Sequence, residues 1–234
     1  MSLPIVIEAP VRGEWLAPNT PGARVPSHGT DRFGARYAID LIQVDWMRRG
    51  WPAYRRSLAH YLARGLTLQD YYCWGSPVVA PCDGLVVAAA DGWPERVRTN
   101  LLADLRRAHD NARHFDPRQH DVRTIAGNHI IIQKEEGVYV ALCHLQQGSV
   151  SICCGQRVQT GQAIGSIGHS GNSMMPHLHM QLMDRCDIAT AQGLPFAFAR
   201  YEVFCDGRWK TVQNSVPDDR TRVRFVPAII YSEK

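Results

Sequence analysis

Long apolar runs are missing from this sequence of 234 residues. The longest, Leu85 to Ala90, has the length of one strand and falls far short of the roughly 18 residues that indicate a membrane-spanning helix. The N-terminus lacks a basic segment followed by an apolar one, so no signal peptide is visible. If a leader has been removed, we expect a periplasmic or secreted protein of the cell envelope; if Met1 is the native start, we expect a cytoplasmic one.

Charge and cysteine patterns exclude two further classes. The net charge is only +4 and no Lys/Arg-rich tract is interleaved with aromatic residues, which argues against a nucleic-acid partner. The seven cysteines include no Cys-x-x-Cys pair, which argues against a structural zinc knuckle. Because their number is odd, at least one thiol stays unpaired within the chain. We expect buried free thiols, and a Cys73–Cys82 disulfide remains an open alternative.

What is present is typical of a folded globular domain with a mainly β core. Hydrophobic residues make up 45% of the chain and charged residues 21%. Short apolar runs are separated by Asp-Gly, Glu-Gly and Gly-rich turn signals. These runs predict strands at residues 36–42, 84–90, 128–134, 137–145 and 176–183.

The segments around these strands differ in character. Residues 1–27 are rich in Pro and Gly and predict an extended N-terminal arm. Residues 43–74 and 92–127 separate the predicted strands as insertions with helical character. The second insertion predicts one amphipathic helix with an apolar face formed by Val97, Leu101, Leu105 and Ala108. Residues 185–234 predict a C-terminal β extension that packs on the same core.

Metal chemistry is indicated most directly by the segment Pro176-His-Leu-His-Met180. Alternate side chains of a strand share one face, so His177 and His179 point to the same side, roughly 7 Å apart. Imidazole is the commonest metal ligand and also carries protons near neutral pH. The pair therefore predicts a hydrolytic zinc site.

Three residues upstream are candidates to complete such a site, because a catalytic zinc ion usually takes three protein ligands and one water. His28 lies in a predicted loop. Asp40 lies among apolar neighbours, where an unpaired carboxylate is costly and a cation would be a suitable partner. His144 ends a predicted strand. Taken one by one, each also has a structural explanation, as a satisfied carboxylate or as a histidine of the core or surface.

The order of these segments resembles the lysostaphin-type (LytM-like) zinc metallopeptidases, which cleave peptide bonds in peptidoglycan. The resemblance covers residues 28–184, interrupted by the two insertions. It implies an antiparallel β-sheet core of the duplicated hybrid motif type with helical insertions. It rests on Gly75-Ser-Pro-Val-Val-Ala-Pro-Cys-Asp-Gly-Leu-Val86, Gly127-Asn-His-Ile-Ile-Ile132, Ala141-Leu-Cys-His-Leu145, the Gly-rich segment 158–173 and Pro176-His-Leu-His-Met-Gln-Leu182.

Carried over residue by residue, the resemblance implies a zinc site with ligands His28, Asp40 and His179. It implies His144 and His177 as catalytic histidines that do not bind the metal. The sequence departs from the family in one spacing: the family often places its first His and Asp four residues apart, whereas His28 and Asp40 are twelve apart.

Three further residues need separate attention. Asp31, three residues after His28, is a rival ligand; we favour Asp40 because Arg36-Tyr-Ala-Ile-Asp40 resembles a subgroup with the longer spacing. Cys143 is expected to face away from His144, since neighbours on a strand point to opposite sides. His169, in Gly-His-Ser-Gly, is expected to serve a turn, with substrate contact as the alternative.

The implied function is that of a zinc-dependent endopeptidase acting on peptidoglycan cross-links or stem peptides, with peptidoglycan or muropeptides as the partner. Two alternatives stay open. The first is a catalytically inactive LytM-like regulator or wall-binding module, against which the presence of all five site residues argues. The second is a zinc hydrolase of soluble peptides, because the insertions 43–74 and 92–127 would narrow a groove and exclude a polymer.

Overall fold

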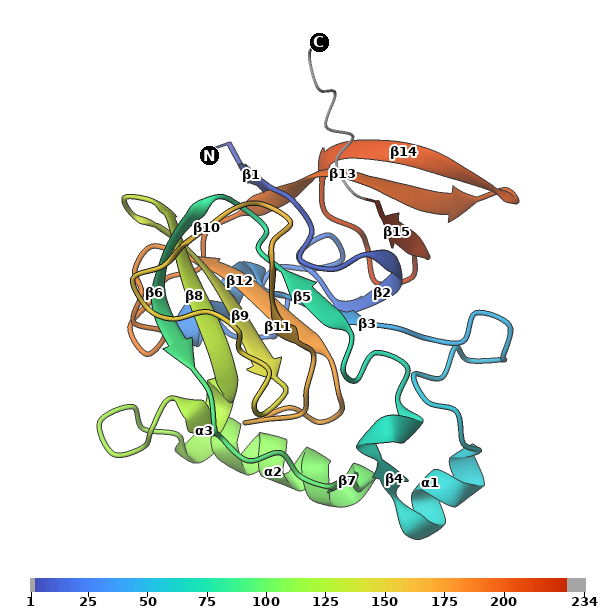
Figure 1. Cartoon of the computed structure of the whole chain (residues 1–234). Helices are drawn as coiled ribbons and strands as arrows, with labels where there is room; N and C mark the ends of the chain where they lie inside the picture. Colours follow the sequence, from blue (N-terminus) through green and yellow to red (C-terminus); the bar gives the residue numbers. More distant parts are fainter. Residues whose placement is uncertain (1–2, 227–234) are drawn as a thin grey trace.

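A large β-sheet forms the body of the protein in the computed structural model, which describes residues 3–226 (Figure 1). The expectations for residues 1, 2 and 227–234 lie outside the described residues. The sheet has eleven strands. They are β1 (Ile5–Ile7), β2 (Gly13–Asn19), β3 (Ile39–Ile42), β6 (Gly84–Ala90), β8 (Asn128–Glu135), β9 (Val138–Leu145), β10 (Arg157–Val158), β12 (Leu178–Met183), β13 (Phe196–Cys205), β14 (Arg208–Ser215) and β15 (Val223–Phe225).

The strand order is β1-β13-β15-β2-β3-β12-β9-β8-β6-β10, with β14 beside β13. Only the β1–β13 pair is parallel among these described strands. Two short ladders lie apart from the sheet: β5 (Pro77–Val79) with β11 (Ala163–Ser166), and β4 (Leu66–Thr67) with β7 (Arg98–Thr99). The prediction of a mainly β, antiparallel fold is therefore confirmed.

Helices gather at one end of the sheet (Figure 1). They are α1 (Leu58–Arg64), α2 (Leu101–His114) and α3 (Arg123–Ala126), with 3₁₀ turns at Arg32–Tyr37 and Leu68–Asp70. The α2 helix begins at Asn100, whose side chain accepts a hydrogen bond from the Ala103 N–H and caps the free end. None of the helices in residues 3–226 is long and apolar enough to cross a membrane.

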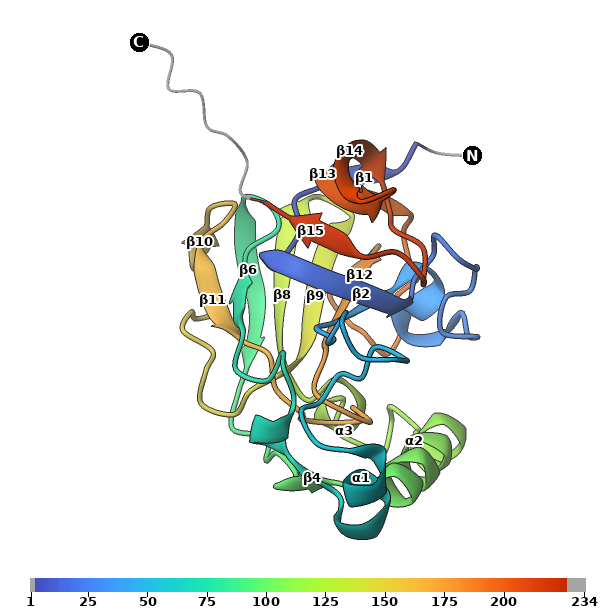
Figure 2. The same ribbon diagram turned by 90° about the vertical axis from the view of Figure 1, so that its right-hand side faces the viewer.

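The main core lies where the sheet curls over itself. Figure 2 shows β2 and β15 crossing in front of β6, β8 and β9. Side chains of both layers share one buried cluster, which contains Trp15, Ile130, Leu142, Met180 and Phe225. On β12 the residues Leu178, Met180 and Leu182 face this cluster, so period-two alternation turns His179 and Gln181 to the opposite face.

The N-terminal segment contributes to the sheet, where the sequence predicts an extended arm. β2 pairs with β3 and β15, and β1 pairs with β13. Trp15 is only 1% exposed and belongs to the main core cluster. The C-terminal strands β13 and β15 supply Phe198 and Phe225 to the same cluster, so both ends of the described chain pack on one core.

The predicted amphipathic helix exists as α2, but of its predicted apolar face only Ala108 is partly buried. Leu101 and Leu105 are 43% and 55% exposed, whereas Asp104 is only 4% exposed. Val97 precedes the helix and is also exposed. Burial of Asp104 is sustained because Arg96 Nε lies 3.2 Å from its Oδ1, so an ion pair on the inner side replaces the expected apolar contact.

All seven cysteines are free thiols, so no disulfide joins Cys73 to Cys82. Cys73, Cys82 and Cys143 are buried as expected. The expectation of burial is wrong for the remaining four, which are exposed: Cys153, Cys154, Cys186 and Cys205.

Candidate active site

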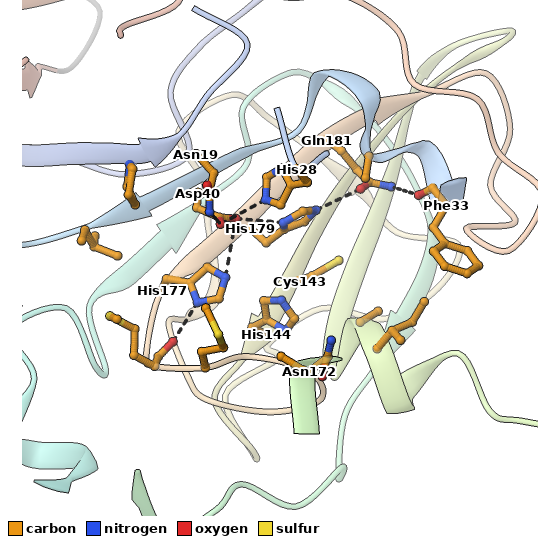
Figure 3. A pocket seen from close by; sticks show the side chains of 18 of the residues that line it. Asn19, His28, Phe33, Asp40, Cys143, His144, Asn172, His177, His179 and Gln181 are labelled. Atoms are coloured by element: carbon orange, nitrogen blue, oxygen red, sulfur yellow. Dashed lines mark hydrogen bonds and ion pairs between the residues drawn. The ribbon is translucent and has the colours of Figure 1, made fainter. Parts of the chain in front are cut away.

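Five side chains meet on the face of β12 that is turned away from the main core (Figure 3). Asp40 comes from β3, directly across the ladder from His179 on β12. The other three come from different parts of the chain: His28 from the loop before the first 3₁₀ turn, His177 from the residue before β12, and His144 from the end of β9. Together they line a cavity of about 520 Å³.

His28, Asp40 and His179 form a tight group, in which both rings contact the carboxylate. His28 Nε2 lies 3.0 Å from Asp40 Oδ2, and His179 Nδ1 lies 2.9 Å from Asp40 Oδ1. One atom from each of the three residues lies within 4.8 Å of the other two. This is a donor set of two imidazole nitrogens and one carboxylate, which suits a catalytic zinc ion with an open fourth position. His144, His177 and His179 form a second group that meets the same 4.8 Å limit between ligand atoms.

Hydrogen bonds around His179 direct one of its ring nitrogens at the Asp40 carboxylate. The Gln181 amide donates through Nε2 to the Phe33 carbonyl at 2.7 Å, so its Oε1 is left to accept from His179 Nε2–H at 2.9 Å. The Nδ1 lone pair of His179 therefore faces an oxygen of the Asp40 carboxylate. Two acceptors at this distance repel each other unless a proton or a metal ion lies between them.

His28 gives a second, independent indication. Its Nε2 is buried and has no hydrogen-bond partner, although Asp40 Oδ2 lies close to it, because the angle does not suit a hydrogen bond. Its Nδ1 lies 3.0 Å from Ser27 Oγ, which fixes the ring. A buried nitrogen without a partner is costly. A metal ion bound by Nε2 would remove that cost, so the residues present fit a metal ion.

The charge states of the tight group point the same way. Burial favours a raised pKa for Asp40, but the nearby His177 and His28 and the hydrogen bond with His179 outweigh it and hold the Asp40 pKa well below its ordinary value. Burial favours a lowered pKa for His179, but its contact with Asp40 outweighs burial and raises the His179 pKa. Asp40 is thus held as an anion, and its charge favours a positively charged partner at the neighbouring histidines.

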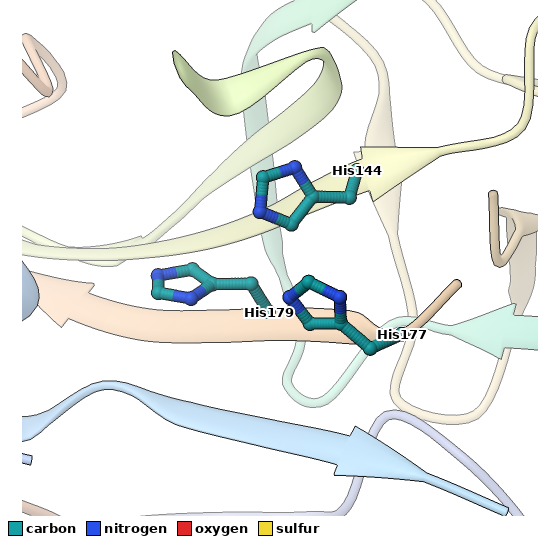
Figure 4. Close-up of side chains that lie close together, drawn as sticks. All are labelled: His144, His177 and His179. Atoms are coloured by element: carbon teal, nitrogen blue, oxygen red, sulfur yellow. The ribbon is translucent and has the colours of Figure 1, made fainter. Parts of the chain in front are cut away.

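His144 and His177 form a second pair beside this group, with ring centroids 4.7 Å apart (Figures 3 and 4). Their Nδ1 atoms lie 3.0 Å from the Ser170 carbonyl oxygen and 2.7 Å from the Met175 carbonyl oxygen, respectively. A carbonyl oxygen only accepts, so each Nδ1 carries the proton and each Nε2 is an acceptor directed away from these bonds. Burial lowers the pKa of both rings, and for His144 the neighbouring His177 lowers it further. Both are neutral bases.

Cys143 and His144 both line the cavity, so the expectation that Cys143 faces away is wrong. Cys143 pairs across the ladder with His179 and shares its face. His144 reaches the same side because its backbone has φ +62°, a left-handed conformation that breaks the strand alternation. Such a conformation costs roughly 1–3 kcal/mol and is found most often at functional sites. Burial raises the pKa of the Cys143 thiol to about 12, with Asp40 adding to the effect, so Cys143 stays protonated.

The rival carboxylate Asp31 lies elsewhere. Its side chain is 63% exposed and forms an ion pair with Arg36 at 2.5 Å. Asp40 is 7% exposed and contacts three of the four site histidines. The geometry brings together the five residues that the sequence singled out and leaves Asp31 outside.

Three supporting residues were not anticipated from the sequence. Gln181 orients His179, Ser27 contacts His28, and Asn19 donates from Nδ2 to Asp40 Oδ2 at 2.8 Å. A signal existed for Gln181, because it follows His179 by two residues on one strand and must share its face. Asn19 had none, since it lies on β2, within the segment for which an arm is predicted.

Comparison with known proteins finds a family match for one segment of the chain. Residues 118–191 match the family model of peptidase family M23. Among solved structures, the catalytic domain of the antimicrobial peptidase lysostaphin from Staphylococcus simulans has 19% identity and a TM-score of 0.37, over 78% of this chain and 88% of that one. A zinc-containing peptidase from Vibrio cholerae has 18% identity and a TM-score of 0.33, over 65% of this chain. The SpoIIQ–SpoIIIAH pore-forming complex has 15% identity and a TM-score of 0.34, over 66% of this chain.

The chain spans 60% of the length of the matched chain in the SpoIIQ–SpoIIIAH complex and 37% of the Vibrio cholerae peptidase. Likenesses as distant as these carry nothing about activity, substrate or partner. The family match is more specific, because the matched segment contains His144, His177 and His179. It confirms the resemblance to LytM-like peptidases: residues 118–191 are similar to peptidase family M23.

Proposed function

We propose that the protein is a zinc-dependent endopeptidase that hydrolyses peptide bonds in peptidoglycan cross-links or stem peptides. In this proposal His28 Nε2, an oxygen of Asp40 and His179 Nδ1 hold the zinc ion. The observation that carries it is the pair formed by Nδ1 of His179 and Oδ1 of Asp40, which are 2.9 Å apart and need a proton or a metal ion between them, beside the buried, unpartnered Nε2 of His28. A substrate in the cell wall implies a periplasmic or secreted location.

The chain's own residues divide the chemical work. A zinc ion bound at these atoms would supply a water with a pKa near 7 and would polarise the scissile carbonyl. His177 Nε2 lies 3.5 Å from Asp40 Oδ1, at the edge of the metal group, where it can take a proton from a reacting water. His144, buried beside it, can hold or return a proton at its own Nε2. Their Nδ1–H bonds to carbonyl oxygens keep both rings in this orientation.

Hydrolysis of soluble peptides is the second candidate, and the cavity wall favours it. Ala108, Ile125 and Ala126 come from the insertion 92–127 and line the cavity together with Met174 and Met175. The wall beside the catalytic pair is thus apolar and is built in part by the insertion. A short peptide enters such a cavity more easily than a cross-linked polymer.

Zinc content and cleavage products test the proposal together. We expect one zinc per chain and new amino groups released from digested sacculi. Asp40→Ala should lose zinc and activity, whereas the matched control Asp31→Ala should keep both, because Asp31 is exposed and paired with Arg36. Turnover of soluble peptides without release from any muropeptide would favour the second candidate. A zinc-free protein, or full activity in Asp40→Ala, would overturn both.

A further inference from the structure

A chain of hydrogen bonds runs from the insertion 92–127 to His177. Arg96 Nη2 lies 2.9 Å from His169 Nε2, His169 Nδ1 lies 3.0 Å from Ser173 Oγ, and Ser173 Oγ lies 3.2 Å from His177 Nδ1. The two middle residues of this hydrogen-bond chain are buried from solvent, since His169 is 0% and Ser173 2% exposed. His169 therefore does not reach substrate, which removes the alternative role considered from the sequence.

The direction of every proton in this chain is fixed by chemistry. A guanidinium only donates, so His169 Nε2 accepts from Arg96 and the His169 proton sits on Nδ1. That proton is donated to Ser173 Oγ. The Ser173 hydroxyl donates its own proton to the Met175 carbonyl, and it has none left to give to His177. His177 Nδ1–H is then held between two acceptors, Met175 O and Ser173 Oγ.

His169 and Ser173 lie in the loop of residues 168–175, and polar contacts anchor both ends of this loop. Arg96 also donates to the carbonyl oxygens of Gly171, at 2.9 Å, and of Ser173. Glu95 accepts from the His169 N–H at 2.6 Å. Asn111 of α2 donates to the Asn172 side chain at 2.8 Å. All three anchoring residues come from the insertion.

A turn alone does not require these residues. The left-handed position of the loop belongs to Gly171, at φ +65°, where a Cβ would overlap the backbone of Gly127. Burying a guanidinium is expensive unless it is paired, and burying an imidazole is costly too. Burial, and then the charge of Arg96, lowers the pKa of His169 to about 2, so the ring stays neutral and keeps the tautomer that Arg96 dictates.

We propose that Arg96, His169 and Ser173 are positioning residues that fix the ring orientation and the tautomer of His177, and that the insertion 92–127 supplies their anchor. The proposal rests on the proposed function only in treating His177 as the proton acceptor. Without His169, the Ser173 hydroxyl is free to rotate and to donate to His177 Nδ1, in competition with the Met175 carbonyl that accepts from the same nitrogen. Part of the protein would then carry the His177 proton on Nε2, the nitrogen that must accept.

The test uses His169→Leu, which removes both bonds, and His169→Asn, which keeps a donor near the place of Nδ1. The matched control is His129→Leu, because His129 of β8 is also buried and its Nδ1 contacts the Gly127 carbonyl, away from the loop 168–175. Nitrogen NMR of His177 in the zinc-loaded protein reports the tautomer directly. We expect one Nδ1–H form in the parent and in the control, a mixture of both forms in His169→Leu, and recovery of the single form in His169→Asn.

Kinetics give the second readout. We expect kcat to fall about 10- to 100-fold in His169→Leu, the size seen when a supporting hydrogen bond is lost at a metal site, with KM and zinc content unchanged. Ser173→Ala breaks the last link with a smaller change in packing and should lower kcat similarly. Ser173→Ala keeps the Met175 carbonyl as the acceptor for His177 Nδ1–H and should keep the single tautomer. An unchanged His177 tautomer in His169→Leu would overturn the proposal. The NMR reading holds whether or not a peptide is cleaved, so failure of the proposed function would remain distinguishable.

Discussion

The strand β12 and the helix α2 stand on two sides of the same cavity and are held in opposite ways. On β12 the apolar residues Leu178 and Met180 are buried and the functional side chains face the cavity. On α2 the leucines face solvent, and the buried side chain is the carboxylate of Asp104. The difference shows that burial of apolar side chains holds the strand that carries the site, whereas polar contacts attach the insertion 92–127 to that strand's surroundings.

Removing one of the two proposed catalytic histidines should have the largest effect. We expect His177→Ala or His144→Ala to lower kcat by about 10²–10³-fold, roughly 2.7–4 kcal/mol in the barrier, because one preorganised contact to the reacting groups is lost. Zinc content, measured by mass spectrometry, should stay at the parent level because neither residue belongs to the proposed ligand set. Loss of zinc together with activity in both variants would contradict the assignment of His144 and His177 as residues that do not bind the metal.

Removing the ion pair between Arg96 and Asp104, which helps to hold the insertion 92–127, should have the second largest effect. Asp104→Ala leaves the Arg96 guanidinium buried with one partner fewer, and we expect a loss of about 3 kcal/mol in the free energy of unfolding. Asp110→Ala is the matched control on the same helix, because its ion pair with Arg106 is exposed and should be worth less than about 1 kcal/mol. Urea denaturation of the three proteins measures the difference. Equal losses in the two variants would mean that α2 is not held by its buried carboxylate.

Acid should weaken the attachment in a predictable direction. The pKa of His169 is about 2 in the folded protein, far below the ordinary 6.5. Below pH 6.5 the His169 ring therefore binds a proton in the unfolded protein but not in the folded one. Stability from this residue is therefore complete above pH 6.5 and falls by about 1.4 kcal/mol per pH unit below it. Urea midpoints between pH 7 and 5 should fall less steeply in His169→Asn than in the parent. Parallel slopes would show that His169 is not held neutral.

The smallest effect is expected at the exposed apolar face of α2. Leu102 is 76% exposed, so Leu102→Ala should change the free energy of unfolding by less than about 0.5 kcal/mol. A loss of several kcal/mol, measured in the same urea titrations, would show that this face is covered in the folded protein in solution.

The same contrast explains what the sequence could predict. The strand at 84–90 and the cavity-facing side chains of His177, just before β12, and His179, on β12, follow from local periodicity, which the sheet preserves. The burial of Asp104 and the role of Asn19 could not be predicted, because both depend on partners that are distant along the chain. The place of Cys143 was missed for a different reason: the left-handed backbone of His144 breaks the alternation on which the expectation rested.

Direct observation of the metal tests the central claim most sharply. Crystals of the zinc-loaded protein, measured at the zinc absorption edge, should show one ion bound by Nε2 of His28, an oxygen of Asp40 and Nδ1 of His179, at about 2.0–2.2 Å. His144 and His177 should lie beside the ion without binding it. An ion held instead by His144 and His177, or a site that stays empty at saturating zinc, would contradict the account.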